Sequence, residues 1–542
     1  MAPWLSMTAA AAVGGVVLNQ LDQFSHHAIA KIFGGLFVGE VALYSIYKVL
    51  IYPFYVSPLR HLPIPPNSHW LFGHGLVILR EKNSDPAKRW IKEMPNDGLI
   101  RYFWFFNIER VLLVSPEAIK EVLVTRSYDF EKPSGVRHLL TTLLGNGLLV
   151  AEGDEHKHQR KSLMPAFSFR HIKDLYPEFW AKTQEGVNAM TREMGEKQEG
   201  EFEALEWASR QTLDVIGVAA IGRDFGAIQN DKSKLVNTYR KIFHPSASGQ
   251  IIGLLSTVIP LQILDYLPVK RNDNVRLAVR AIRKHCQDVI EQKRAEAKEG
   301  IEGKLSILSV SLESGLDDEQ LVNQLMTFLA AGHETTATSM AWAIYMLCCH
   351  PEMQDKLRAE VREHLGTLDR DITNNNIDRM PYLQAFISEI IRYWSPVPTF
   401  VRDAPRDTTV LNQLVPANTR FIISTWATNL DSNLWGDDAD TFRPERWLAL
   451  GEDDVADRKA VASGGAVSNF AMLSFSHGPR SCIGSSFARA EFACLLAGWV
   501  GRFEFELVNK ESMDREKLEV RTGITARPAD GVQVIAKVIP GF

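Results

Sequence analysis

The sequence predicts a mainly α-helical protein with small β-sheets, in one large domain behind an N-terminal apolar anchor. Three observations support this fold class. Helical patterns occupy most of the chain after residue 67, whereas strand-like pieces are short and scattered. No second linker, internal repeat or low-complexity segment interrupts the chain beyond that point.

The first element is an apolar N-terminus, which we interpret as a membrane anchor over residues 1–56. Residues 1–21 carry no charged side chain, and a second apolar stretch at 32–55 contains only Glu40 and Lys48. Each stretch is near the length that spans a bilayer, so one or two spans are expected. Lys48 and Arg60 flank the end of the second stretch and favour a cytosolic main domain. The alternative is an amphipathic N-terminus bound to the membrane surface.

A proline-rich hinge over residues 57–68 follows, and residues 69–542 form the main domain. Pro63, Pro65 and Pro66 favour a stiff, extended connector. In the domain, Asp317 and Gln320 have the spacing of a capping box that opens a helix of about 33 residues. Further helices are expected at 277–299 and 381–394, and strands at 99–103, 111–114, 419–424 and 532–538.

Composition excludes some classes of function. The chain has 542 residues, 23% of them charged, and a net charge of −5. Without a basic run, we expect no nucleic-acid partner. Its five cysteines have no paired spacing, which argues against a disulfide framework and against a Cys-x-x-Cys metal site.

The most informative motif lies near the C-terminus and reads Phe-x-x-Gly-x-Arg-x-Cys-x-Gly, from Phe475 to Gly484. The Cys482 thiolate can be the axial ligand of a haem iron. Glycines such as Gly478 let the backbone turn sharply and approach a flat macrocycle. Arg480 can pair with a haem propionate, and Phe475 can shield the sulfur from water.

A second motif lies in the middle of the long predicted helix. Ala331 and Gly332 are small enough for a flat ligand to lie against this face. Thr335 offers a hydroxyl to a helix carbonyl or a bound oxygen, and Glu334 can pass protons from solvent. A mid-helix glycine costs about 1 kcal/mol against alanine, so a functional reason is expected.

Together these motifs resemble the cytochrome P-450 family of haem-thiolate monooxygenases, in the family's order along almost the whole chain after the anchor. The resemblance implies the P-450 fold, haem b ligated by Cys482, and insertion of one atom of O₂ into an apolar substrate. Thr335 and Glu334 would then deliver protons. Glu389, Arg392 and Arg446 would form one buried charge network under the haem loop, with a structural role.

The resemblance also assigns residues around the haem. Arg402 and Arg160 match arginines that bind propionates, and His156 stands where the family has a tryptophan. Residues 245–264 match a membrane-dipping loop, although an ordinary buried loop and helix fits equally well. The expected substrate pocket includes Val397, Thr399, Phe400 and Ile524.

The implied partners are an NADPH-dependent flavoprotein reductase, membrane lipid, O₂ and a lipophilic small molecule, because no flavin- or ferredoxin-like segment is present. The expected location is the endoplasmic reticulum membrane. Residues 155–161 are most similar to fungal microsomal members, many of which tailor secondary metabolites. The alternatives are a xenobiotic or fatty-acid hydroxylase, a peroxide-rearranging isomerase or dehydratase, and a non-enzymatic haem-binding membrane protein. Thr335 and Glu334 argue against the last two.

Overall fold

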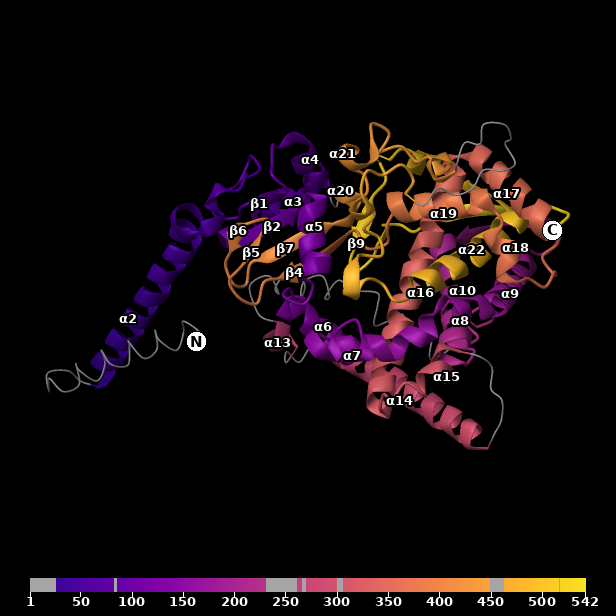
Figure 1. Cartoon of the computed structure of the whole chain (residues 1–542), viewed down its shortest axis with the longest axis horizontal. Coiled ribbons are helices and arrows are strands. Elements are labelled where there is room, and N and C mark those ends of the chain that lie inside the picture. The colour runs from indigo at the N-terminus through magenta and orange to yellow at the C-terminus, as the bar shows by residue number, and fades with distance from the viewer. Residues whose placement is uncertain are drawn as a thin grey trace.

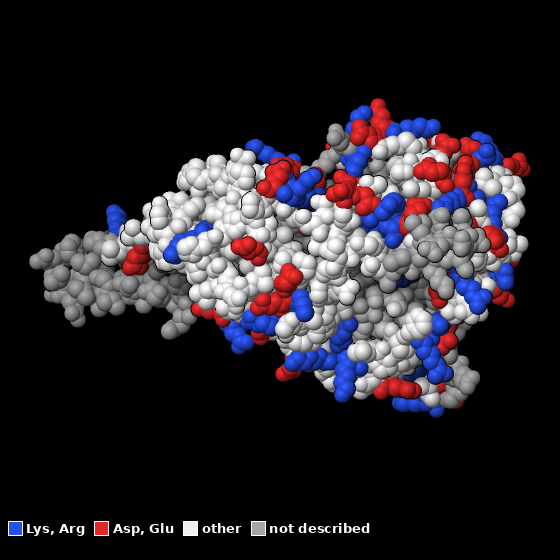
Figure 2. All heavy atoms as spheres, turned by 45° about the horizontal axis from the view of Figure 1, so that its top comes forward, with Lys and Arg blue, Asp and Glu red and all other residues white. Residues whose placement is uncertain are grey.

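The computed structural model describes residues 26–81, 85–230, 261–265, 270–299, 306–448, 463–515 and 517–542. One long helix stands out from a body in which the first strands lie toward the anchor and most helices, with the C-terminus, lie beyond them (Figure 1). The predicted fold class, mainly helical with small sheets, is confirmed. In Figure 2 the charged side chains crowd the helical end, whereas the surface next to the anchor is mostly uncharged.

The projecting helix carries the apolar N-terminal stretch. Helix α2 (His26–Ile46) continues into a π-helical segment, η1 (Tyr47–Val56). Within it, the 23 residues Gly34–Val56 are long and apolar enough to cross a membrane, and none of the helix's most apolar window is buried in the protein. The other expected span, residues 1–21, and most of the 245–264 segment lie outside the described residues.

The connector after the anchor is bound to the body of the protein. The fully buried Arg101 donates from Nη2 to the carbonyl of Pro53 at 2.6 Å and pairs through Nε with Glu109 at 3.1 Å. Ser57 donates to the same carboxylate at 2.7 Å. A buried charge needs such partners to offset its lost hydration. These contacts tie the end of the anchor helix to the first two strands, so the connector is clamped rather than free.

The described residues form four small sheets. The largest has the strand order β1-β2-β7-β4, in which β2 and β7 are parallel and the other pairs antiparallel. A second sheet has the order β3-β11-β8, and β9–β10 and β5–β6 are two-stranded. The strands are β1 (Leu99–Phe103), β2 (Glu109–Leu113), β3 (Glu199–Glu203), β4 (Thr399–Asp403), β5 (Thr408–Val410), β6 (Gln413–Val415), β7 (Arg420–Ser424), β8 (Phe503–Leu507), β9 (Val520–Thr522), β10 (Ala526–Pro528) and β11 (Gln533–Val538).

The helical core is built around α16 (Asp318–Cys349), whose 32 residues are mostly buried. Its capping box is as predicted. The Asp317 carboxylate accepts from the backbone N–H of Gln320 at 2.7 Å, and the Gln320 side-chain oxygen accepts from the backbone N–H of Asp317 at 3.1 Å. Helices α10 (Ala204–Ile216), α14 (Lys270–Lys298) and α22 (Ser485–Arg502) pack against it. The others are α3 (Gly75–Arg80), α4 (Asp85–Glu93), α5 (Pro116–Lys120), α6 (Ser134–Leu144), α7 (Gly153–Leu163), α8 (Phe169–Asp174), α9 (Tyr176–Met194), α13 (Leu261–Leu264), α15 (Ile307–Ser311), α17 (Pro351–Leu365), α18 (Asn374–Asp378), α19 (Pro381–Tyr393), α20 (Thr425–Thr428) and α21 (Ser432–Trp435).

Helix α22 approaches α9 closely because glycine stands at the contact. A Cβ added at Gly498 would overlap the γ-methyl of Thr183 on α9. That threonine is fully buried, and its hydroxyl donates to the carbonyl of Phe179 at 2.8 Å, which fixes its rotamer. The methyl group therefore cannot rotate away without breaking a buried hydrogen bond.

We expect Gly498→Ala to destabilise the protein. Overpacking costs about 1–3 kcal/mol, which exceeds the roughly 1 kcal/mol that alanine adds to helix propensity. Thr183→Ser removes the obstructing methyl and keeps the hydroxyl, so Gly498→Ala in that background should be neutral or stabilising. Denaturant unfolding of the four proteins measures the difference. Equal losses in both backgrounds would contradict this account of the contact.

Candidate functional site

The Cys482 loop follows the 3₁₀ turn η10 (Asn469–Ala471) and leads into α22. Gly478 adopts φ +74° at the start of the 3₁₀ turn η11 (Gly478–Arg480), so the sharp turn expected there is present. Its missing side chain makes room for the backbone of Leu123 and Val124 on a neighbouring π-helical segment, η4 (Glu121–Thr125). Phe475 fixes the other side of the loop, because its carbonyl accepts from the Cys482 amide at 2.9 Å.

Cys482 lies deep in the protein, but part of the residue is not covered by other protein atoms. The residue keeps solvent-accessible area, yet burial is the main cause that raises the pKa of its thiol. The backbone N–H of Gly484 and the guanidinium of Arg160 act in the opposite direction and favour the thiolate. Arg160 also donates to the carbonyl of Ser481 at 2.7 Å. The family resemblance predicts that Arg160 binds a haem propionate. In the structure its guanidinium binds the backbone of the Cys482 loop next to the cysteine sulfur.

Helix α16 exposes one small patch within its buried length. Ala331 is exposed and Thr335, one turn later, is partly exposed, whereas the preceding turns are buried. The Thr335 hydroxyl donates to the Ala331 carbonyl at 2.8 Å. Gly332 has a packing reason, since an added Cβ would stand 2.6 Å from Cδ1 of Ile216 on α10. A larger residue there would force the Ile216 side chain to move, so close helix packing favours glycine in addition to any ligand contact.

Glu334 lies beside Thr335 and binds the C-terminal segment. Its Oε1 accepts from the Thr525 hydroxyl at 2.8 Å. Burial raises the pKa of Glu334, while Thr525 and the nearby Arg527 lower it in part. A carboxyl group with a raised pKa can hold and release a proton nearer to neutral pH.

A cluster of buried cations surrounds one carboxylate near the loop. Arg480 forms an ion pair with Glu152, and Lys132 lies 3.6 Å from the same carboxylate. Arg402 is also buried here, and burial and the charge of Arg480 lower its pKa to about 10. The same causes, with Arg402 added, lower the pKa of Lys132 to about 7. Three cations thus share one anion.

His156 completes this cluster as a neutral ring. It is buried, its Nδ1 lies 3.1 Å from the hydroxyl of Tyr128, and its pKa is lowered to about 4 by burial and by Arg480, Lys132 and Arg160. The sequence motifs do not indicate Lys132, Glu152 or Tyr128. These residues lie in separate segments and match no spaced pattern.

This cation cluster can bind a ligand that carries carboxylates and that also contacts the exposed Cys482 thiol. The Nε of Arg480 has no hydrogen-bond partner among the described residues, and buried guanidinium donors are rarely left unpaired. Haem has two propionates, which would supply the missing negative charge to Arg480, Arg402 and Lys132. The uncovered Cys482 sulfur and the small, exposed Ala331 suit its iron and its flat ring.

The predicted structural network is assembled around Glu389 on α19. Its carboxylate accepts two hydrogen bonds from Arg392, at 2.8 and 2.7 Å, and one from Arg446 at 3.0 Å. The Trp447 indole adds a bond at 2.9 Å and the Arg443 amide one at 2.8 Å. Glu389 and Arg392 are fully buried. The carboxylate therefore has enough donors to offset its desolvation.

The four expected pocket residues divide between different surroundings. Thr399 and Phe400 are neighbours on β4, so their side chains point to opposite faces of the strand. Phe400 packs against the apolar core beneath the sheet, on the same face as Arg402, whose guanidinium carbon lies 5.7 Å from its ring. Val397 is partly exposed, and Ile524 is 54% exposed. Phe400 and Thr399 therefore cannot form one wall together.

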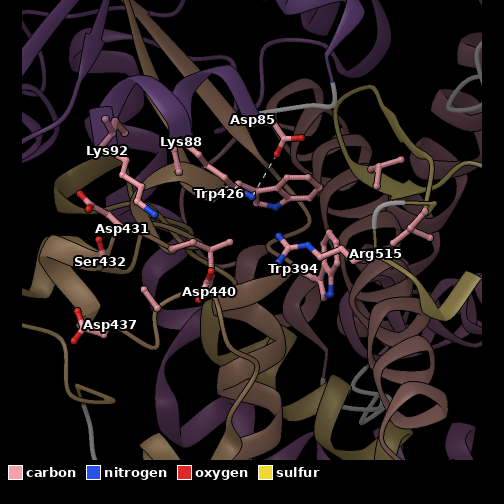
Figure 3. Close-up of a pocket in the computed structure, with 16 residues that line it drawn as sticks. Asp85, Lys88, Lys92, Trp394, Trp426, Asp431, Ser432, Asp437, Asp440 and Arg515 are labelled. Carbon is pink, nitrogen blue, oxygen red and sulfur yellow. Dashed lines mark ion pairs between the residues drawn. The ribbon is translucent and has the colours of Figure 1, made fainter. Parts of the chain in front are cut away.

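A separate surface pocket of about 400 Å³ lies between α4, α20 and the segment before β9 (Figure 3). Its lining mixes charges of both signs, and Lys88 pairs with Asp85 at 3.9 Å. Trp394 and Trp426 form its inner wall, with ring centres 5.4 Å apart. None of the residues predicted from the motifs lines this pocket.

Comparisons with known proteins agree with this geometry. A family model described as Cytochrome P450 matches residues 63–532. The chain is 42% identical to cytochrome P450 monooxygenase sphH of Aspergillus fumigatus, over 94% of this chain and 93% of that protein. It is 41% identical to cytochrome P450 monooxygenase ALT8 of Alternaria alternata, over 94% of each chain. Identity to cytochrome P450 monooxygenase FUM15 of Gibberella moniliformis is 40%, over 92% and 91%.

The chain therefore belongs to the cytochrome P450 family, and its class is that of a haem-thiolate monooxygenase. The family's cofactor is haem with a cysteine thiolate as axial ligand, for which Cys482 is the motif residue. The predictions of family, enzyme class and cofactor are confirmed. Membership also implies a redox partner, O₂ and a small-molecule substrate.

We expect Lys132→Met to weaken haem retention about 10-fold, because one charge-assisted bond of roughly 1.4 kcal/mol is lost. Lys88→Met is the matched control, since burial also lowers the pKa of Lys88, to about 8, in the separate pocket. Transfer of haem to an excess of an apo-globin measures the retention. Equal rates for wild type and Lys132→Met would remove Lys132 from the haem site.

The same lysine predicts a pH dependence of haem uptake by the apoprotein. Nearby carboxylates raise the pKa of a lysine. The pKa of Lys132 should therefore rise from about 7 when haem binds. The contribution of Lys132 to affinity is then fully present below pH 7 and declines as the pH rises above it. Lys132→Met should lack this decline in a haem titration.

We expect Glu389→Gln to cost about 3–5 kcal/mol of stability, because two buried guanidinium groups lose their anion. Glu445→Gln is the control from the same motif. Its carboxylate instead pairs with the half-exposed Lys356 at 2.7 Å, and such pairs contribute roughly 0–1 kcal/mol. Thermal unfolding and the haem content of the purified proteins report the difference. Similar losses for the two variants would show that the network does not depend on Glu389.

Proposed function

We propose that this monooxygenase inserts oxygen into a lipophilic small molecule as a tailoring step in fungal secondary metabolism. The observation that carries the proposal is the uncovered Cys482 thiol combined with the exposed Ala331–Thr335 patch in an otherwise buried core. The fungal monooxygenases aligned above, at 40–42% identity over more than nine-tenths of the chain, support the tailoring role. Hydroxylation, epoxidation and multi-step oxidation all fit this chemistry.

The residues of the chain have separate tasks in this reaction. Haem, when bound, supplies reductive activation of O₂. Cys482 holds the cofactor, and Gly484 and Arg160 stabilise the negative charge on its sulfur. Lys132, Arg402 and Arg480 orient it through its carboxylates. Thr335 presents a hydroxyl oxygen at the exposed patch, and its own proton is directed to the Ala331 carbonyl.

Glu334 is proposed to deliver protons beside this hydroxyl. Its raised pKa favours a protonated carboxyl group at a higher pH than an ordinary glutamate allows. The hydrogen bond from Thr525 fixes the position of the carboxyl and links it to the segment that carries Ile524. Val397, Thr399 and Ile524 are the proposed contacts to the substrate. Burying hydrocarbon there would stabilise binding by about 25 cal/mol per Å².

We further propose that the protein is anchored in the endoplasmic reticulum membrane with residues 69–542 in the cytosol. The apolar helix Gly34–Val56 supports the anchor. Large apolar side chains near its end are exposed, among them Tyr55 (75%) and Trp70 (65%). The surface next to the anchor is mostly uncharged in Figure 2. Lipid can cover such a surface. Electrons would come from an NADPH-dependent flavoprotein reductase in the same membrane.

Expression in a fungal host with and without such a reductase, followed by untargeted metabolite comparison, tests the proposal. We expect a new, more polar derivative of an apolar host or pathway metabolite only when the reductase is present. Cys482→Ala should lose both the product and the red-shifted Soret band of the ferrous–CO form. Product formation without a reductase or NADPH would instead indicate a peroxide-rearranging enzyme. Conversion of only fatty acids or xenobiotics would assign the alternative hydroxylase function.

A further inference from the structure

The surface pocket of Figure 3 has the size and lining of a small-molecule site. Its volume of about 400 Å³ lies within the range of roughly 300–1,000 Å³ that is usual for ligand pockets. None of the residues assigned above to haem, to proton delivery or to the substrate lines it. A ligand in this pocket would therefore bind apart from the cofactor and the substrate.

Two buried indoles make the inner wall of the pocket rigid. The Nε1 of Trp426 donates to the carbonyl of Ser395 at 2.7 Å, and the Nε1 of Trp394 lies 3.3 Å from the sulfur of Met346. The ring of Trp394 also stacks on Trp342 of α16, with ring centres 3.9 Å apart and planes 1° apart. Because both indole N–H groups are bonded within the protein, this wall offers a ligand only apolar surface. Aliphatic side chains continue the apolar lining: Ile91, Leu430, Leu518 and Val520.

Two cations lie against this indole wall. The Nζ of Lys88, on α4, is 5.8 Å from the centre of the Trp426 ring. The guanidinium carbon of Arg515, in the segment before β9, is 5.5 Å from the centre of the Trp394 ring. Arg515 also donates to the hydroxyl of Tyr393, which holds the guanidinium in place. The positively charged groups therefore lie beside the apolar wall.

Positive charge is in excess around Lys88. Burial, and then the charge of Arg515, lower the pKa of Lys88 to about 8. Asp85, at 3.9 Å from Nζ, and Asp440 oppose this shift only in part. Lys132 in the haem site has a lowered pKa for the same two kinds of cause, burial and neighbouring arginines. A further anion beside Lys88 would relieve the repulsion between the two cations.

Other acidic side chains of the pocket lie on its far side. In Figure 3, Asp431 and Asp437 lie across the pocket from Arg515. Asp431 is engaged in capping α21, because its carboxylate accepts from the backbone N–H of Asn433 at 3.0 Å and from the side-chain amide at 3.1 Å. These acids would repel a ligand with several negative charges, so a single carboxylate is favoured over a phosphate.

We propose that this pocket binds a small apolar molecule with one carboxylate, which lies between Lys88 and Arg515 while the hydrocarbon lies against the indole wall. The planar guanidinium of Arg515 matches the geometry of a carboxylate, and Lys88 adds a point charge. Burial of the hydrocarbon against the apolar lining adds to the affinity. The inference does not depend on which substrate the enzyme oxidises.

Calorimetric titration of the full-length holoenzyme with 2-naphthoate tests the binding. Saturating 4-phenylimidazole, which ligates haem iron, keeps the probe out of the haem site, and an unchanged Soret band verifies this. We expect one saturable site. Its affinity should fall about 10-fold in Lys88→Met and in Arg515→Met, because each variant loses one charge-assisted bond. Lys88→Arg keeps the charge and should retain most of the affinity.

An uncharged probe and a neighbouring lysine are the matched controls. We expect 2-naphthamide, which has the same rings and no charge, to bind about 10-fold more weakly than 2-naphthoate to the wild type. Its affinity should be the same for wild type and Lys88→Met. Lys92, one turn further along α4, lines the pocket on the side of Asp431 (Figure 3). Lys92→Met should therefore leave the affinity for 2-naphthoate close to that of the wild type.

Proton uptake gives a readout that a purely structural role of Lys88 would not produce. A bound carboxylate raises the pKa of Lys88 from about 8. Binding should therefore take up protons at pH 8, measured as a dependence of the heat on the ionisation enthalpy of the buffer. The contribution of Lys88 to affinity is fully present well below pH 8 and declines as the pH rises above it. Lys88→Met should show neither effect.

Three results would overturn the inference. The first is absence of saturable binding of both 2-naphthoate and decanoate to the wild type. The second is an equal loss of affinity in Lys88→Met and Lys92→Met, which would indicate unspecific attraction to positive charge. The third is equal affinity of the wild type for 2-naphthoate and 2-naphthamide, a comparison that needs no variant to fold. Failure of the proposed oxidation would leave all three measurements intact, since none of them requires turnover.

Discussion

The buried carboxylate of Glu389 is the interaction on which the position of Cys482 depends. It holds Arg392 through Nε and Nη2. Nη1 of Arg392 donates to the carbonyls of Asn429, at 2.9 Å, and of Ala439, and Nη2 also donates to the carbonyl of Thr441. The Asn429 side chain then accepts from the amide of Leu473 at 2.8 Å, at the entrance to the Cys482 loop. A chain of buried hydrogen bonds thus runs from α19 to the ligand loop. Because the charged members are all hydrogen-bonded and buried, the network favours one geometry.

A second charged cluster near the Cys482 loop is not balanced in this way, because its positive charges outnumber its negative ones. Lys132, Arg402 and Arg480 share the single carboxylate of Glu152, and the lowered pKa values of Lys132 and Arg402 record the cost of that excess charge. A ligand with two carboxylates removes the cost, so binding of the cofactor and stability of this region are linked. The Glu389 network is complete among the protein's own residues, whereas haem propionates would complete the cation cluster.

The sequence predicts well those parts of the site that are contiguous. The Cys482 loop, the Thr335 turn and the capping box at Asp317 are local patterns whose residue types follow from local geometry. Lys132 and Glu152 could not be found in this way, because their roles arise only when distant segments fold together. Alternation along β4 also separates Phe400 from Thr399, although both were expected at one pocket. The anchor is predictable from hydropathy, but its clamp through Arg101 depends on tertiary contacts.

In helix α16, side-chain hydroxyls bond to the helix backbone in a segment that neighbouring helices hold in place. Three hydroxyls of this stretch, those of Thr335, Thr336 and Ser339, donate to carbonyls one turn earlier on the same helix. Such bonds compete with the helical ladder and weaken it slightly. The cost is tolerated because the surrounding helices hold α16 along most of its length. Proton transfer needs hydroxyl groups that can rotate on a backbone that stays fixed. Here the Thr335 and Thr336 hydroxyls can rotate, while the neighbouring helices hold the backbone of α16 in place. Glu334 on this turn has a raised pKa mainly because it is buried, and the hydrogen bond from Thr525 links the turn to the C-terminal segment.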